Sequence, residues 1–260
     1  MILELEHIKM SYTNARKEVF NLLGDVNMGI ETGSVTALIG GNGAGKTTLF
    51  NIISGFEKRF SGQVKFKGKD IAKMAPYKIS RMGIGRLFQG RQLMDDLTLL
   101  ENMKIASDNT TGEKPFDFIL QMRKVKKSES AKEQKAEEVL TKVFGQDNKY
   151  LEMLDRKASE LSYGEQRLLA LASLLMRSDE LLLLDEPTSG VNLRYIESFK
   201  SIIRELAGQK KTVLLIEHNM PFVRDVADKC FYLSGGEIIK TGSANDVLDD
   251  EDVRKDYLGL

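Results

Sequence analysis

A glycine-rich octapeptide, Gly-Gly-Asn-Gly-Ala-Gly-Lys-Thr at residues 40–47, constrains the fold of this chain more than any other feature. It follows a mostly apolar run, residues 35–39, that is typical of a buried strand, and a helix is expected to begin at about Lys46. The octapeptide fits the pattern G-x-x-x-x-G-K-[ST], in which backbone N–H groups turn toward phosphate oxygens at the positive end of a helix. A glycine-rich turn with an incidental lysine is the alternative, but the flanking strand and helix favour a phosphate site.

This loop contains most of the residues expected to contact a nucleoside triphosphate. Lys46 is expected to bridge the β- and γ-phosphates, and the hydroxyl of Thr47 to ligate Mg²⁺. The nucleotide contacts predicted in this segment are Gly40, Asn42, Gly43, Ala44, Gly45, Lys46, Thr47 and Thr48.

An acidic pair follows a second buried strand. Four leucines at residues 181–184 precede Asp185 and Glu186, so that Asp185 is expected to hold Mg²⁺ directly or through water. Glu186 stands just beyond this ligand, where a carboxylate can accept a proton from an attacking water, and we assign it as the general base or as a group that polarises the water. The alternative is an Asp-Glu pair that ends a strand at the surface. Kinases, GTPases, helicases and transport ATPases all combine such elements, which therefore predict a triphosphate site without naming a function.

The apolar runs lack polar alternation, which favours strands covered on both faces and hence an α/β core with a parallel sheet. Between residues 100 and 157 the chain becomes rich in charge, and apolar residues recur there at helical spacing from Ala136 to Phe144. We predict a helical insert there. Strands are predicted at 2–12, 25–30, 35–39, 63–67, 84–88, 181–184 and 213–217, with a hairpin over 229–241, and helices from about residue 46, at 76–82, at 165–177 and at 193–207.

Composition excludes several classes of protein. The 38 basic residues equal the 38 acidic residues in number, which argues against a chain whose main partner is nucleic acid. Cys230 is the single cysteine, so a disulfide framework is excluded and a reducing, cytosolic compartment is expected. No apolar run reaches the roughly 18 to 20 residues needed to cross a bilayer, and the alternating first strand is unlike a signal peptide.

A third motif identifies a family. The segment Leu-Ser-Tyr-Gly-Glu-Gln at residues 161–166 is followed by a predicted helix, and Gln166 stands 19 residues before Asp185. It resembles the LSGGQ signature of ATP-binding cassette (ABC) ATPases. By itself, a serine before a helix would be an ordinary N-cap. The resemblance implies that Ser162, Gly164 and Glu165 contact the nucleotide held by a second subunit, so that two subunits pair head to tail around two ATP molecules.

Four further matches support this resemblance. Gln89 ends a predicted strand at the position of the family's glutamine loop, which senses Mg²⁺ and the attacking water. His218 matches the switch histidine that contacts the γ-phosphate, and residues 189–192, ending in Asn192, match the D-loop. Tyr12, 28 residues before Gly40, matches the aromatic residue that stacks on adenine. Catalytic roles are therefore implied for Glu186, His218 and Gln89, nucleotide contacts for Tyr12 and Asn192, and metal contacts for Thr47, Gln89 and Asp185.

A narrower resemblance is to the branched-chain (hydrophobic) amino-acid uptake ATPases. It depends on residues 83–89, Gly-Ile-Gly-Arg-Leu-Phe-Gln, and 215–220, Leu-Ile-Glu-His-Asn-Met, among other segments. Subfamilies that handle urea, lipopolysaccharide or other lipids share many of these residues. Departures from the usual pattern are Gly41 for proline, Tyr163 for the first signature glycine, Val191 for leucine and Asn192 for the commoner aspartate, and none of them removes a catalytic group.

The resemblance implies an α/β fold of the P-loop NTPase class, with a RecA-like core, an antiparallel β subdomain and a helical subdomain. Residues 1–260 would form one ABC ATPase domain, with 1–92 and 160–260 as the core and β subdomain and 93–159 as the helical subdomain. It implies ATP and Mg²⁺ as cofactors, a homodimer or a heterodimer with a paralogous ATPase, and integral membrane permease subunits as partners. The chain would lie peripherally on the cytoplasmic face of the plasma membrane, without nucleic acid. A soluble ABC ATPase in a cytosolic assembly complex is the rival hypothesis.

Overall fold

The protein is described by a computed structural model that covers residues 1–13, 18–90, 92–107, 122–145, 150 and 152–258, with backbone alone at 122–128 and 256–258. The chain divides into two compact units. Unit 1 comprises Met1–Gln89, Asp179–Ser189 and Ile203–Leu260, and unit 2 comprises Gly90–Ser178 and Gly190–Ile202. Residues 160–178, assigned to the core by sequence, therefore group with the insert, and the predicted subdomain boundaries stay a prediction.

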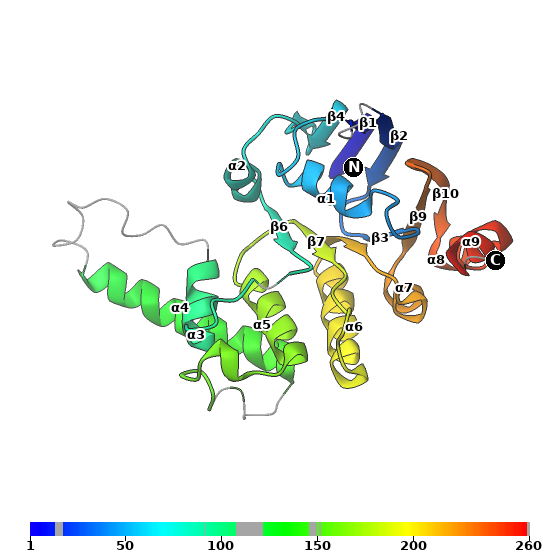
Figure 1. Ribbon diagram of the computed structural model, residues 1–260. Coiled ribbons are helices and arrows are strands. Elements are labelled where there is room, and N and C mark those ends of the chain that lie inside the picture. The colour runs from blue at the N-terminus through cyan, green and yellow to red at the C-terminus, as the bar shows by residue number, and fades with distance from the viewer. Residues whose placement is uncertain (14–17, 91, 108–121, 146–149, 151, 259–260) are drawn as a thin grey trace. The chain divides into compact units, whose positions relative to one another are not determined.

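Unit 1 contains a six-stranded sheet in the order β10-β9-β3-β8-β7-β6. Five of these strands, β3, β6, β7, β9 and β10, are labelled in Figure 1. Its strands pair in parallel from β9 to β6, and β10 is antiparallel to β9. Every residue of β3, β7 and β8 is buried, as expected for strands covered on both faces. The strands are β3 (Val35–Ile39), β6 (Ile84–Leu87), β7 (Leu181–Asp185), β8 (Thr212–Ile216), β9 (Lys229–Ser234) and β10 (Glu237–Ser243).

This topology determines where the predicted site residues meet. The loop at 40–45 follows β3, Gln89 follows β6, Asp185 ends β7, and His218 follows β8. Because β3, β8, β7 and β6 are parallel neighbours, their carboxyl ends lie at one edge of the sheet. The order of the strands thus brings together residues that are far apart in the sequence.

A second, antiparallel sheet in unit 1 has the order β2-β1-β4-β5. Leu3 and Leu5 of β1 are buried, whereas Glu4 and Glu6 are only partly buried, which confirms the predicted alternation. The strands are β1 (Leu3–Thr13), β2 (Val19–Ile30), β4 (Ser61–Phe66) and β5 (Lys69–Asp70), so that β2 begins six residues before its predicted start at residue 25.

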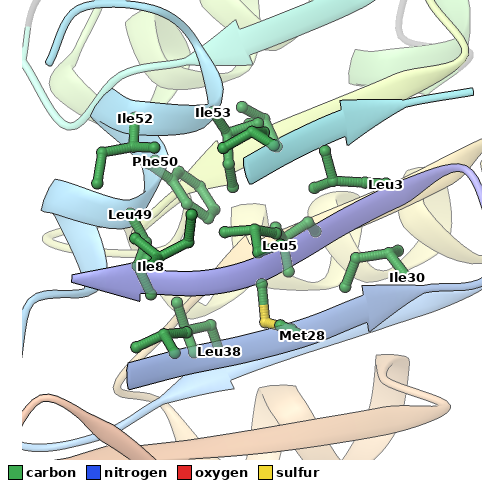
Figure 2. Packing of buried hydrophobic residues seen from close by; sticks show 14 of the residues in the cluster. Leu3, Leu5, Ile8, Met28, Ile30, Leu38, Leu49, Phe50, Ile52 and Ile53 are labelled. Atoms are coloured by element: carbon green, nitrogen blue, oxygen red, sulfur yellow. The ribbon is translucent and has the colours of Figure 1, made fainter. Parts of the chain in front are cut away.

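Helix α1 (Lys46–Ile53) packs in the core that the two sheets of unit 1 share. Figure 2 shows Leu49, Phe50, Ile52 and Ile53 of this helix gathered with Leu3, Leu5 and Ile8 of β1 and with side chains of β2 and β3. The helix that follows the glycine-rich loop is therefore fixed by burial of its apolar face. The other helices of unit 1 are α2 (Pro76–Arg81), α7 (Met220–Val226), α8 (Ala244–Leu248) and α9 (Glu251–Leu258).

Unit 2 is helical in its described residues. Its α-helices α3 (Leu99–Ala106), α4 (Met122–Phe144) and α5 (Tyr163–Leu175) pack on one another, and a 3₁₀ turn, Ala158–Glu160, precedes α5. The predicted apolar stripe of α4 is confirmed, because Ala136, Val139, Leu140 and Val143 are all buried and Phe144 is partly buried. Helix α6 (Leu193–Gly208) begins in unit 2 and ends in unit 1. Among the described helices, none is both long enough and apolar enough to cross a bilayer.

Candidate active site

The glycine-rich loop adopts a conformation that only glycine allows at two positions. A Cβ atom at Gly40 would lie 2.1 Å from the carbonyl oxygen of Leu233 in the neighbouring strand β9. Gly45 has a φ of 103° and forms the N-cap of α1 without a side-chain cap. The first-turn N–H groups of α1 therefore face the loop without a capping side chain, as an anion site at a helix N-terminus requires.

Lys46 folds back across this loop. Its Nζ donates hydrogen bonds of 2.8 Å to the carbonyl oxygens of Gly40 and Gly41, and only 6% of the residue is exposed. Burial lowers the pKa of Lys46, and the negative charges of Glu186 and Asp185 oppose that effect. The predicted phosphate ligand therefore lies within electrostatic range of both predicted acidic residues.

Asp185 lies at the buried end of β7, with 1% of its side chain exposed. Its Oδ2 accepts a 2.8 Å hydrogen bond from Nη2 of Arg86 in β6, whose side chain is 5% exposed. Nη1 of Arg86 donates to Asn51 Oδ1 and Ser54 Oγ at 2.8 Å each, and its guanidinium lies 4.4 Å from the ring centre of Phe88. The predicted metal ligand is thus fixed by a buried ion pair that also joins β6 to the end of α1.

The three predicted catalytic residues meet at the carboxylate of Glu186. Gln89 Nε2 donates to its Oε2 at 2.7 Å, and His218 Nε2 lies 3.3 Å from its Oε1. Glu186 has a φ of 48°, a left-handed conformation that costs a non-glycine residue about 1–3 kcal/mol. Its N–H donates to the carbonyl oxygen of Ile216 at 2.9 Å, which helps to hold this turn.

The donor set fits Mg²⁺. The hydroxyl of Thr47 in α1 and the carboxylate of Asp185 are hard oxygen ligands, which Mg²⁺ prefers together with phosphate oxygens and water. Ligation by Gln89 would use its amide oxygen, because its amide nitrogen donates to Glu186. In the described part of the chain, no group of three or more His, Cys, Asp or Glu side chains forms a separate metal centre.

Tyr12 lies near the end of β1, in the antiparallel sheet of unit 1. The residue is 40% exposed, and the Arg59 guanidinium lies 6.0 Å from its ring centre. An accessible aromatic ring at this position is compatible with stacking on a base, which stays a prediction.

The signature segment lies in unit 2, where Ser162 is the N-cap of α5. Its Oγ accepts from the N–H of Glu165 at 3.4 Å, and its own N–H donates to Glu165 Oε2 at 2.8 Å, which completes a capping box. The Oγ also donates to Glu165 Oε2 at 2.7 Å. Tyr150 donates from its hydroxyl to Glu165 Oε1 at 2.9 Å. Burial, followed by hydrogen bonds with Tyr195 and Glu165, raises the pKa of Tyr150. Ser162, a predicted contact of the nucleotide in a second subunit, is therefore oriented by Glu165, which Tyr150 holds in turn.

Two close contacts between glycine and tyrosine, both within unit 2, join the signature to the first turn of α6 and to the D-loop. A Cβ atom at Gly164 would lie 2.7 Å from Cδ2 of Tyr195, and one at Gly190 would lie 3.1 Å from Cε1 of Tyr163. Asn192 directly precedes α6, and its Oδ1 accepts from the N–H of Arg194 at 3.1 Å. Tyr163, the departure from the usual signature, therefore packs on the D-loop glycine.

Sequence reasoning missed three residues of these networks. Arg86 is a charged residue in an otherwise apolar strand, and that contrast could have marked it as a partner for a buried acid. Glu217 was predicted as the last residue of a strand, whereas β8 ends at Ile216 and the Glu217 side chain turns into a hydrogen-bond network. The sequence offers no signal for the contact of Tyr150 with Glu165, because Tyr150 precedes the signature in a different segment.

The sequence of this chain is similar to those of known proteins. A family model described as ABC transporter matches residues 23–189. A probable branched-chain amino acid transport ATP-binding protein LivG from Archaeoglobus fulgidus is 37% identical over 243 residues, covering 91% of this chain and 89% of that protein. The high-affinity branched-chain amino acid transport ATP-binding protein BraF from Pseudomonas aeruginosa is 33% identical over 90% of each chain.

Solved structures agree with this assignment. A nucleotide-free ATP-binding cassette from an ABC transporter has a TM-score of 0.78 and 32% identity, over 100% of this chain and 99% of that chain. The ADP conformation of an ATP-binding cassette of an ABC transporter has a TM-score of 0.78 and 30% identity over the same shares. The α/β fold predicted from the sequence, with its antiparallel sheet and helical part, is confirmed. The chain therefore belongs to the ABC transporter family, as one of its ATP-hydrolysing cassettes.

Proposed function

We propose that this cassette is the ATP-hydrolysing subunit of an importer for branched-chain or other hydrophobic amino acids. One observation supports the catalytic part of this proposal: Gln89 and His218 both contact the carboxylate of Glu186, at the sheet edge that also carries the phosphate loop. The substrate class follows from the names of the relatives, which are branched-chain amino acid transport ATP-binding proteins. This chain matches them along about 90% of their length.

The residues of unit 1 divide the reaction between them. The loop N–H groups and Lys46 bind the phosphates. Thr47 and Asp185 would hold Mg²⁺, which would supply positive charge to the phosphate oxygens. Glu186 accepts a proton from a water that attacks the γ-phosphorus, while the bond from that phosphorus to the bridging oxygen breaks and ADP leaves. His218 and Gln89 hold the Glu186 carboxylate and would orient the water and the γ-phosphate.

The residues of the signature act on a second subunit in this proposal. Ser162, Gly164 and Glu165, with Asn192, would contact the ATP held by the partner, which is either a second copy or a paralogue. Ser162 stands at the N-terminus of α5, and its hydroxyl, which donates to Glu165 in the single chain, would donate to a phosphate oxygen of the partner's ATP instead. ATP binding would then close the pair of subunits, and hydrolysis would reopen it.

Ser162→Arg tests the shared site. The variant should bind ATP as a monomer with wild-type affinity, because Ser162 lies outside the phosphate loop, yet fail to hydrolyse it. Ser201→Arg, on an exposed position of α6, is the matched control and should hydrolyse ATP normally. Wild-type hydrolysis by Ser162→Arg would refute the shared site.

The proposed partners are integral membrane permease subunits, which would hold the cassette peripherally at the cytoplasmic face of the plasma membrane. Nucleic acid is not among the proposed partners. The test is to purify the cassette from solubilised membranes, identify its partners, and measure ATP hydrolysis by the reconstituted complex. Multi-spanning partners and stimulation by leucine, isoleucine or valine with their binding protein support the proposal. Stimulation by urea or lipid favours a different transporter, and soluble partners alone favour a cytosolic assembly complex.

A further inference from the structure

Glu217 is a buried acidic residue to which the reaction described above gives no role. It is 2% exposed and directly follows β8. Its Oε1 accepts from the N–H and the hydroxyl of Thr188 at 2.8 and 2.6 Å, and its Oε2 accepts from the N–H groups of His218 and Asn219 at 3.0 and 3.2 Å. A buried carboxylate is costly unless hydrogen-bond donors surround it, and here four neutral donors do so.

These donors come from the two chain segments that carry the proposed base and the switch histidine. Thr188 stands two residues after Glu186, and His218 directly follows Glu217. The ladder between β7 and β8 ends where Asp185 pairs with Ile216. Beyond that pair, the carboxylate of Glu217 connects the two segments, because it accepts hydrogen bonds from Thr188 in one and from His218 and Asn219 in the other.

The connection matters because the turn at Glu186 is strained. A left-handed non-glycine residue persists only where its surroundings fix it. The N–H of Glu186 is held by Ile216 O, and the chain two residues later is held by Glu217 at Thr188. Glu217 thus fixes the exit of this turn and, through its other oxygen, the backbone of His218.

We propose that Glu217 is a positioning residue that sets the geometry between Glu186 and His218, a role that rests on the proposed hydrolysis mechanism. Both oxygens must be acceptors. A glutamine has the same shape, but its NH₂ group would face the donors of Thr188 or those of His218 and Asn219. The segment that faces the NH₂ group would lose its hydrogen bonds to residue 217. ATP binding would not change, because the hydrogen bonds described for Glu217 go to Thr188, His218 and Asn219 and not to the phosphate loop or Lys46.

The test compares Glu217→Gln and Thr188→Val with Thr212→Val. Thr212 is a matched control, because it is also buried and its hydroxyl also makes one hydrogen bond, in which it accepts from the N–H of Gly33 at 3.0 Å at the other end of β8. We expect Glu217→Gln to lower kcat by about 10²-fold and Thr188→Val by about tenfold, with the dissociation constant for ATP and the KM unchanged. Thr212→Val should keep the wild-type kcat.

The outcomes distinguish a failure of the positioning role of Glu217 from a failure of the proposed function. Wild-type kcat in both Glu217→Gln and Thr188→Val would refute positioning, as would a loss of ATP binding that matches the loss of kcat, because that pattern indicates a structural role. If Glu217→Gln does not fold, Thr188→Val decides, since it removes one hydroxyl only. Absence of hydrolysis by the wild-type protein would instead contradict the proposed function.

Discussion

Replacing Arg86 by methionine should destabilise the fold through Asp185. The variant keeps an unbranched apolar side chain beside Phe88 but removes the 2.8 Å ion pair with Asp185 and the hydrogen bonds to Asn51 and Ser54. Asp185 is 1% exposed and would keep a buried charge without its cation.

The magnitude follows from this burial. Removing one partner of a buried ion pair costs about 3–5 kcal/mol, because the remaining charge is uncompensated. For a chain of this size the midpoint of thermal unfolding should fall by about 10 °C. An exposed pair behaves differently, since water screens it. Lys65→Met, which removes the ion pair of Lys65 with the half-exposed Glu6, is therefore the control and should unfold at the wild-type midpoint.

Urea unfolding of the nucleotide-free protein measures this effect. Arg86→Met combined with Asp185→Asn removes both charges, so the double variant should recover most of the stability that Arg86→Met loses. A loss below about 1 kcal/mol in Arg86→Met, the range of exposed pairs, would refute the reasoning. Strictly additive losses in the double variant would also refute it.

Three further predictions concern other parts of the chain. Gly40→Ala should abolish ATP binding in calorimetry, because its Cβ atom would lie 2.1 Å from Leu233 O. Tyr150→Phe should destabilise the fold by about 1 kcal/mol in urea unfolding and slow hydrolysis without weakening ATP binding. Burial raises the pKa of Cys230 from 9.0 to about 12, so its stabilising contribution is complete below pH 9.0 and is lost as the pH rises through 12. Iodoacetamide at pH 8.5 should alkylate Cys230 only in urea, and alkylation of the native protein would contradict its burial.

Much of the fold was predictable where local sequence determines the backbone. The strand at Val35–Ile39 and the start of α1 at Lys46 match the prediction to the residue, because the glycines between them permit few other paths. The start of β2 at Val19 was missed. Residues 19–21 are exposed, and they become a strand by pairing with β1 across a bulged register that local sequence does not encode.

The site residues also divide into those that local sequence identifies and those that depend on the folded structure. Asp185, Glu186 and Lys46 could be predicted as site residues because short motifs carry them, and their roles stay predictions. Arg86 and Glu217 were missed because a charged residue acquires its role from partners about 100 and 29 residues away, Asp185 and Thr188, and only the sheet order brings them together. The roles of the signature residues stay predictions, since they concern a second subunit.

ATP hydrolysis by Glu186→Gln tests the central claim most directly. The measurement is the release of inorganic phosphate by purified wild-type protein and variant, with ATP binding and dimer formation followed in parallel. We expect the variant to bind ATP and to form an ATP-dependent dimer, while its turnover falls by at least about 10²-fold, because the carboxylate that accepts the proton is gone. Hydrolysis at the wild-type rate would contradict the assignment of Glu186 as the base, and with it the reaction proposed for this site.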